Sequence, residues 1–117
     1  MDSGEQYNLT KIKAFVGNNK KIIDNIIDIF LNNTPEMLSI INKGLKEKDY
    51  NKISFYSHKL KSSIDSFSIN ELTSEIRLIE NFSKEKSSLE ELPQLINNLN
   101  VIMNRVIQKV KDDFHKA

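Results

Sequence analysis

The stretch Ile53–Phe67, ISFYSHKLKSSIDSF, decides the fold of this chain because its apolar residues recur at intervals of three and four. That spacing is typical of an α-helix, which turns by about 100° per residue. One side of the expected helix is therefore apolar, and it is formed by Ile53, Tyr56, Leu60, Ile64 and Phe67. His58 lies roughly 160 to 240° around the helix from these residues. The segment predicts a helix that packs on a core and presents His58 on its outer side.

The neighbours of His58 make its face a candidate reactive site. Lys61, Ser62 and Asp65 follow it by three, four and seven residues, so they share its side of the helix. An imidazole titrates near pH 6.5 and is largely neutral and nucleophilic near neutral pH, whereas lysine amines stay protonated. We therefore interpret His58 as a nucleophile, Lys61 as its supporting cation, and Ser62 and Asp65 as neighbours within reach of a bound partner.

Other residues are candidates for partner contacts rather than for chemistry. Phe55 lies about 60° from His58 around the helix and is not needed by the apolar stripe, while Lys59 lies about 100° away. On the long helix expected upstream, Ile22 and Ile29 belong to a second apolar stripe beside the core one. A partner helix can lie on such a stripe unless the first short helix of this chain covers it.

Helical spacing recurs along the rest of the chain, which has three glycines and two prolines. We expect helices at about Leu9–Val16, Asn19–Lys48, Asp49–Phe67, Ser68–Lys84 and Leu92 to the end. The polar stretch 83–88 should form the loop before the last helix. Short connections between the last four helices predict an all-α fold, an antiparallel up-and-down four-helix bundle with a short extra N-terminal helix.

Local signals place the ends of these helices. Asp49 is a good N-cap for the helix that carries His58. Ser68 and Glu71 have the spacing of a capping box, so the fourth helix should begin at Ser68. Pro35 should bend the long helix because it removes one backbone donor.

Composition limits the classes of function. Among 117 residues, 17 basic and 16 acidic side chains give a net charge of +1, which favours no nucleic-acid partner. The chain has no cysteine, and its histidines are His58 and His115, so we expect neither a metal site nor a cofactor. No apolar run approaches the roughly 20 residues of a membrane span, so we expect a cytoplasmic protein with no membrane partner. We divide it into a polar N-terminal tail, residues 1–7, and one helical domain, residues 8–117.

The run His58-Lys59-Leu60-Lys61-Ser62-Ser63, with Leu72 and Glu80 downstream, resembles the core motif of histidine-containing phosphotransfer (HPt) domains. In that family a His-x-Leu-Lys-Gly-Ser run on one helix is followed by a small residue, a leucine and a glutamate on the next. Three residues of the expected long helix also resemble the family: Phe30, Pro35 and Leu38. The resemblance covers most of the chain.

This resemblance implies that His58 accepts a phosphoryl group from the aspartate of one receiver domain and passes it to another. The chain would then be a phosphocarrier without kinase activity of its own, and its partners would be receiver (response-regulator) domains and a hybrid sensor histidine kinase. Lys61 would pair with the phosphoryl oxygens while charge is transferred. A receiver domain brings its own metal ion and catalytic carboxylates. This chain would therefore need to supply only a nucleophile and a docking surface for phosphotransfer, and we expect it to act as a monomer.

Two positions depart from the family motif, because Ser62 and Ser68 stand where glycine is usual. Ser62 is still small enough to let a partner's active site approach the imidazole, and its hydroxyl can reach a phosphoryl group. Ser68 would gain the capping role described above, which glycine fills less well.

Two other interpretations stay open. The dimerisation helices of an autophosphorylating kinase also display a histidine, but there an acidic residue commonly follows it, whereas Lys59 does here. The chain also has no glycine-rich phosphate loop. A helical-bundle adaptor or inhibitor would bind receiver or kinase domains without being phosphorylated, and the two glycine replacements mildly favour it. Only the chemistry of His58 separates this adaptor from a phosphocarrier.

Overall fold

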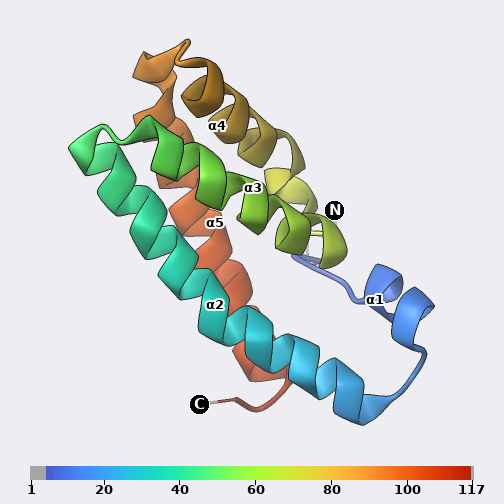
Figure 1. Ribbon diagram of the computed structural model, residues 1–117. Helices are drawn as coiled ribbons and strands as arrows, with labels where there is room; N and C mark the ends of the chain where they lie inside the picture. The colour runs from blue at the N-terminus through green and yellow to red at the C-terminus, as the bar shows by residue number, and fades with distance from the viewer. Residues whose placement is uncertain (1–4, 117) are drawn as a thin grey trace.

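The computed structural model describes residues 5–116, and these residues form helices and no β-strand (Figure 1). Its α-helices are α1 (Thr10–Val16), α2 (Lys20–Glu47), α3 (Tyr50–Ser66), α4 (Thr73–Glu85) and α5 (Leu92–Asp113). Single turns of 3₁₀-helix at Asn70–Leu72 and Leu89–Glu91 precede α4 and α5. The predicted all-α class is confirmed. Residues 1–4 of the predicted polar tail lie outside the described residues.

Helix α3 lies between α2 and α4, and it makes its most extensive contacts with these two helices (Figure 1). Helix α5 packs against both α4 and α2 and so closes the core on the other side. The side of α3 predicted to be apolar is indeed turned inward: Ile53, Leu60, Ile64 and Phe67 are buried. Because this side is held in the core, the side that carries His58 faces solvent.

The predicted starts of α2 and α3 are confirmed by their capping hydrogen bonds. The side chain of Asn19 accepts from the backbone N–H of Ile22 at 3.2 Å, and that of Asp49 accepts from the N–H of Lys52 at 3.1 Å. Each carboxyl or amide oxygen satisfies a donor that the first turn of a helix leaves free. Helix α2 continues without a break through Pro35.

The predicted start of the fourth helix at Ser68 is wrong. Ser68 has a left-handed backbone with φ of 52°, and its N–H donates to the carbonyl of Asp65 at 3.2 Å, so it terminates α3. The next residue, Ile69, is fully buried, and α4 begins only at Thr73, without a side-chain cap. The capping-box spacing failed as a signal because the chain first has to reverse direction and bury Ile69 in the core.

The predicted loop at residues 83–88 also begins too early, because α4 continues to Glu85. Ser83 is fully buried, and its hydroxyl donates to the carbonyl of Ile79 at 2.6 Å. A serine can occupy the buried side of a helix when the previous turn accepts its proton in this way. The polarity of Ser83 was therefore a misleading signal for a loop.

The segment before α1 is fixed to the C-terminal ends of α5 and α3. The hydroxyl of Tyr7 donates to Asp113 Oδ2 at 2.6 Å, and the N–H of Asn8 donates to the carbonyl of Phe67 at 2.9 Å. Lys11 Nζ adds a bond to the carbonyl of Asp65 at 3.2 Å. These contacts hold α1 beside the end of α3. Within residues 5–116, no helix is long and apolar enough to cross a membrane.

Candidate functional site

His58 stands on the outer side of α3 with 66% of its side chain exposed. Its neighbours in sequence explain this position, because Ser57 and Leu60 are fully buried and fix the rotation of the helix. An imidazole anchored by a buried helix and open to solvent can be approached by a second protein. The spacing of apolar residues in the sequence predicted this orientation.

Glu80 of α4 joins the two residues that the sequence suggested for chemistry. Its Oε2 lies 2.8 Å from His58 Nδ1, and its Oε1 lies 2.8 Å from Lys61 Nζ. Glu80 reaches this position because it stands at the edge of the buried side of α4, which Ile76, Ile79 and Ser83 form. One carboxylate thus bridges a histidine and a lysine that are one turn apart on α3.

The electrostatics of this bridge keep Glu80 ionised. Partial burial alone would raise the pKa of the Glu80 carboxyl, but hydrogen bonds from Lys61 and His58 outweigh that effect, and the pKa lies below its ordinary value. Only 18% of the Glu80 side chain is exposed, so water competes weakly for its oxygens. The carboxylate is therefore an anion at neutral pH that can only accept hydrogen bonds.

This protonation state determines which nitrogen of His58 can react. Because the Glu80 carboxylate only accepts, His58 Nδ1 must carry the proton of the neutral ring and donate it to Oε2. The lone pair then lies on Nε2, at the exposed end of the ring. The arrangement can present Nε2 as a nucleophile and can stabilise positive charge that develops on the ring after attack.

Asp65 lies on the same side of α3 but is bound to a cation of its own. Arg77 of α4 holds it in a two-point contact, with distances of 3.2 Å from Nη1 to Oδ1 and 2.8 Å from Nη2 to Oδ2. The hydrogen bond from Arg77 is the main reason why the pKa of the Asp65 carboxyl is lowered. Asp65 thus joins α3 to α4, and any contact with a partner has to compete with Arg77.

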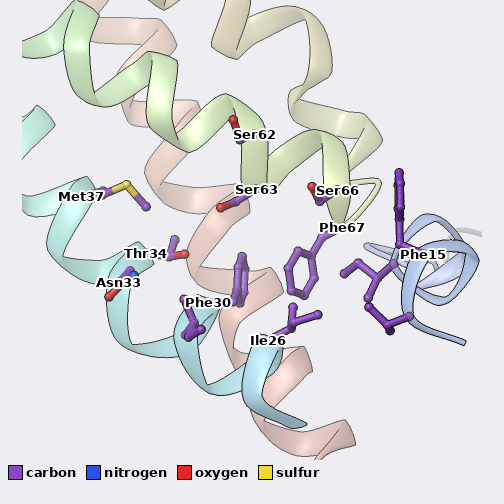
Figure 2. Close-up of a pocket in the computed structure, with 13 residues that line it drawn as sticks. Phe15, Ile26, Phe30, Asn33, Thr34, Met37, Ser62, Ser63, Ser66 and Phe67 are labelled. Carbon is purple, nitrogen blue, oxygen red and sulfur yellow. The ribbon is translucent and has the colours of Figure 1, made fainter. Parts of the chain in front are cut away.

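The other side of α3 borders an open apolar groove of about 340 Å³ between α1, α2 and α3 (Figure 2). Stacked rings of Phe30 and Phe67, with centroids 4.3 Å apart, belong to its lining. The remaining lining residues are Ile12, Phe15, Val16, Ile26, Ile29, Asn33, Thr34, Met37, Ser62, Ser63 and Ser66. Ser62, one turn beyond His58, therefore stands where the reactive face meets the groove.

The candidate contact residues differ in where the structure places them. Ile29 lines the groove and is 59% exposed, whereas Ile22 is 41% exposed but lies outside the groove lining. Phe55 is exposed on α3, and the Lys59 ammonium lies 5.0 Å from the centre of its ring. The structure thus brings Ile29 and Ser62 to one groove and pairs Phe55 with Lys59.

Among residues 5–116, no three histidine, aspartate or glutamate side chains gather closely enough to hold a metal ion. Of the polar side chains in the groove, Thr34 is fully buried, and its hydroxyl has no hydrogen-bond partner. The chemically competent cluster of this part of the chain is the group formed by His58, Glu80 and Lys61.

Comparison with known protein families agrees with this geometry. A family model described as the Hpt domain matches residues 25–116, which include all of α3, α4 and α5 and most of α2. This chain belongs to the Hpt domain family. Hpt domains serve phosphotransfer in two-component signalling, where they interact with receiver domains and kinases and act as phosphocarriers rather than as enzymes. Comparisons with curated proteins and with solved structures gave no match.

Glu80 is the residue of this Hpt domain that sequence reasoning failed to place in the site. It entered only as part of the family resemblance, with no role assigned. A signal was present, because Glu80 directly follows the buried stripe of Ile76 and Ile79 at the edge of an amphipathic helix. Its pairing with His58, 22 positions earlier in the chain, required the packing of α4 on α3.

Proposed function

We propose that this Hpt domain carries a phosphoryl group on His58 between receiver-domain aspartates in a phosphorelay. The observation that carries the proposal is the 2.8 Å contact between His58 Nδ1 and Glu80 Oε2, with the other end of the ring open to solvent. This contact gives the histidine the tautomer that a nucleophile needs. A solvated surface histidine would have no such partner.

In the proposed step, the lone pair of His58 Nε2 attacks the phosphorus of an aspartyl phosphate on a receiver domain. The N–P bond forms, the P–O bond to the aspartate breaks, and the electron pair leaves on the aspartate carboxylate. The Nδ1 proton stays between His58 and Glu80, whose negative charge offsets the positive charge of the phosphorylated ring. Transfer to a second receiver reverses these steps.

Lys61 acts in two ways in this proposal. In the free protein its ammonium holds Glu80 Oε1 and so fixes the carboxylate that orients His58. During transfer it lies one turn from the reacting nitrogen and can offer a remaining N–H to a phosphoryl oxygen. Ser62 stays small enough to admit the partner, and its hydroxyl can contact the phosphoryl group.

The receiver domain would dock on the surface around His58. The groove beside Ser62 supplies apolar area with Ile29 at its edge, and Ile22 extends the exposed apolar stripe of α2. Phe55 and Lys59 add an aromatic ring and a cation on α3. Asp65 takes part only if a partner displaces Arg77 from it.

The remaining assignments belong to the same proposal. We interpret α2, α3, α4 and α5 as an antiparallel up-and-down four-helix bundle, residues 8–117 as its domain, and α1 as the added short helix. The protein would act as a cytoplasmic monomer without kinase activity, and it would exchange phosphate with receivers linked to a hybrid sensor histidine kinase.

The test is to incubate the purified chain with a panel of phosphorylated receiver domains and to map phosphate by mass analysis at alkaline pH, where phosphohistidine survives. We expect one phosphoryl group, located on His58. Phosphate on another residue would contradict the proposed site. Binding of receivers without any transfer would instead establish the adaptor or inhibitor as the function.

A further inference from the structure

Lys59 is held in place by aromatic rings. Its ammonium lies 5.0 Å from the ring centre of Phe55 and 5.8 Å from that of Tyr56. The two rings meet edge to face, with centroids 5.1 Å apart and planes at 81°. Within residues 5–116, no carboxylate forms an ion pair with Lys59, although most neighbouring charges on α3 are paired. Lys59 is therefore a positioned cation whose N–H donors remain available.

This cation lies on the groove side of α3. Lys59 and Ser63 are four residues apart, so they occupy the same side of the helix, and Ser63 lines the groove (Figure 2). The rise between them is about 6 Å, and the rise to Ser66, near the far end of the groove lining on α3, is about 10 Å. The groove and Lys59 thus form one continuous surface along α3.

Charged residues adjoin the groove at both ends, but those at the end beside α1 already have partners: Asp65 is paired with Arg77, and Lys11 donates to the carbonyl of Asp65. All residues that line the groove are uncharged. Lys59 places a single positive charge at one end, and it directly follows His58 in the chain. An apolar groove that ends in one available cation complements an amphipathic helix whose apolar side chains are followed by a carboxylate.

We infer that Lys59 is a specificity-determining contact for such a helix of the partner. The helix would place apolar side chains in the groove and an aspartate or glutamate side chain, one to two turns away, on the Lys59 ammonium. The identification of this partner as a receiver domain rests on the proposed function. The rings hold the ammonium before binding, so less side-chain freedom is lost on docking than for a solvated lysine.

This role differs from that of Lys61. Lys61 contacts the carboxylate that orients His58, whereas Lys59 lies about 100° away around the helix. A change at Lys59 should therefore alter the affinity for the partner and leave the transfer rate within the complex unchanged. The separation of Kd from the maximal rate distinguishes docking from chemistry.

The experiment compares Lys59→Glu, Lys59→Met and the parent against a panel of purified receiver domains. Lys43→Glu is the matched control, because Lys43 is an exposed lysine of α2 that neither lines the groove nor forms an ion pair within the described residues. Equilibrium binding to unphosphorylated receivers and single-turnover transfer are both measured. Lys59→Met keeps an unbranched apolar side chain over the rings and removes the ammonium, with its charge and its N–H donors.

We expect Lys59→Glu to weaken binding about tenfold and Lys59→Met about threefold, with the control within about twofold of the parent. The difference in Kd between Lys59→Glu and the parent should become smaller in about 1 M salt, where charges are screened beyond roughly 3 Å. Maximal transfer rates should stay within about twofold of the parent.

The outcomes separate this inference from the proposed function. Transfer to His58 with unchanged binding by Lys59→Glu would overturn the inference and leave the proposed function intact. Binding that depends on Lys59 without any transfer would support the inference and refute the phosphocarrier. If the parent chain neither binds nor accepts phosphate from any receiver, both are wrong.

Discussion

The two sides of α3 are built from different chemistry. On the side of α4, charged groups are paired at short range: Glu80 holds both His58 and Lys61, and Arg77 holds Asp65. On the side of α2, the groove is apolar and open, and Lys59 stands on its aromatic rings at one end of it. One helix thus separates a preorganised reactive group from a surface suited to recognition. Mutations on the two sides should therefore have separable effects.

The largest expected effect is the loss of the nucleophile. His58→Gln should abolish phosphoryl acceptance, because glutamine has no lone pair on a nitrogen that can attack phosphorus. Since the His58 side chain is 66% exposed, the fold should tolerate the change, with a thermal midpoint close to that of the parent. Mass analysis and circular dichroism measure the two quantities. Equal phosphorylation of the variant would refute the assignment.

A second change tests the α4 side. Glu80→Gln should lower the transfer rate by about tenfold to a hundredfold, by analogy with the loss seen when the carboxylate that orients a metal-binding histidine is removed. Binding of the receiver should change little, because Glu80 is only 18% exposed. Lys61→Met serves as the companion variant. An equal loss in both would mean that Lys61 acts through Glu80, and a larger loss in Lys61→Met would indicate its own contact with the phosphoryl group.

On the α2 side, Ile29→Asp should weaken receiver binding by about tenfold, or 1.4 kcal/mol, and leave the maximal transfer rate unchanged. The aspartate would place a charge at the edge of an apolar groove that has none. Val101→Asp is the matched control, because Val101 is 53% exposed on α5, compared with 59% for Ile29. Equal binding by both variants would exclude the groove as the docking surface.

The bridge that Glu80 forms with His58 and Lys61 should also affect how the free energy of unfolding depends on pH. The pKa of Glu80 is lower in the folded protein than its ordinary value of 4.5, so its ionised form stabilises the fold above that pH. This contribution is lost as the pH falls through the lowered pKa. The stability that Glu80 adds relative to Glu80→Gln should therefore be present above the lowered pKa and lost below it. Urea titrations of the parent and Glu80→Gln at several pH values measure this contribution, and a difference in unfolding free energy that is as large below the lowered pKa as above it would contradict the bridge.

The smallest effect concerns the turn after α3. Ser68→Gly should stabilise the fold by about 0.5 kcal/mol, because relief of the left-handed strain exceeds the added freedom of the unfolded chain. Asp49→Ala, which removes a true N-cap, should destabilise it by about 1 kcal/mol. Thermal or urea unfolding measures both. A loss of stability in Ser68→Gly would contradict backbone strain at this position.

The sequence was sufficient where a local signal determines the structure. The spacing of Ile53, Leu60 and Ile64 predicted which side of α3 is buried, and Asp49 predicted where that helix begins. The sequence was insufficient where packing against a distant segment determines the local conformation. Ser68 has the residues of a cap, but the burial of Ile69 forces it into a turn.

The candidate site shows the same limit. His58 and Lys61 are neighbours on one helix and could be paired from spacing alone. Their common partner Glu80 comes from the next helix, so its contact depends on how α3 and α4 pack. The groove needs three helices at once and has no signature in any single stretch of sequence.

The hydrogen bond between Tyr7 and Asp113 joins residues that are 106 positions apart. During synthesis at about 5–20 residues per second, Tyr7 is added roughly 5 to 20 s before its acceptor. Helices α2, α3 and α4 are all complete in sequence before Asp113 is added. The contacts of Asn8 and Lys11 with α3 can therefore form earlier than the contact of Tyr7 with α5. The segment before α1 is fully fixed only after α5 has been made.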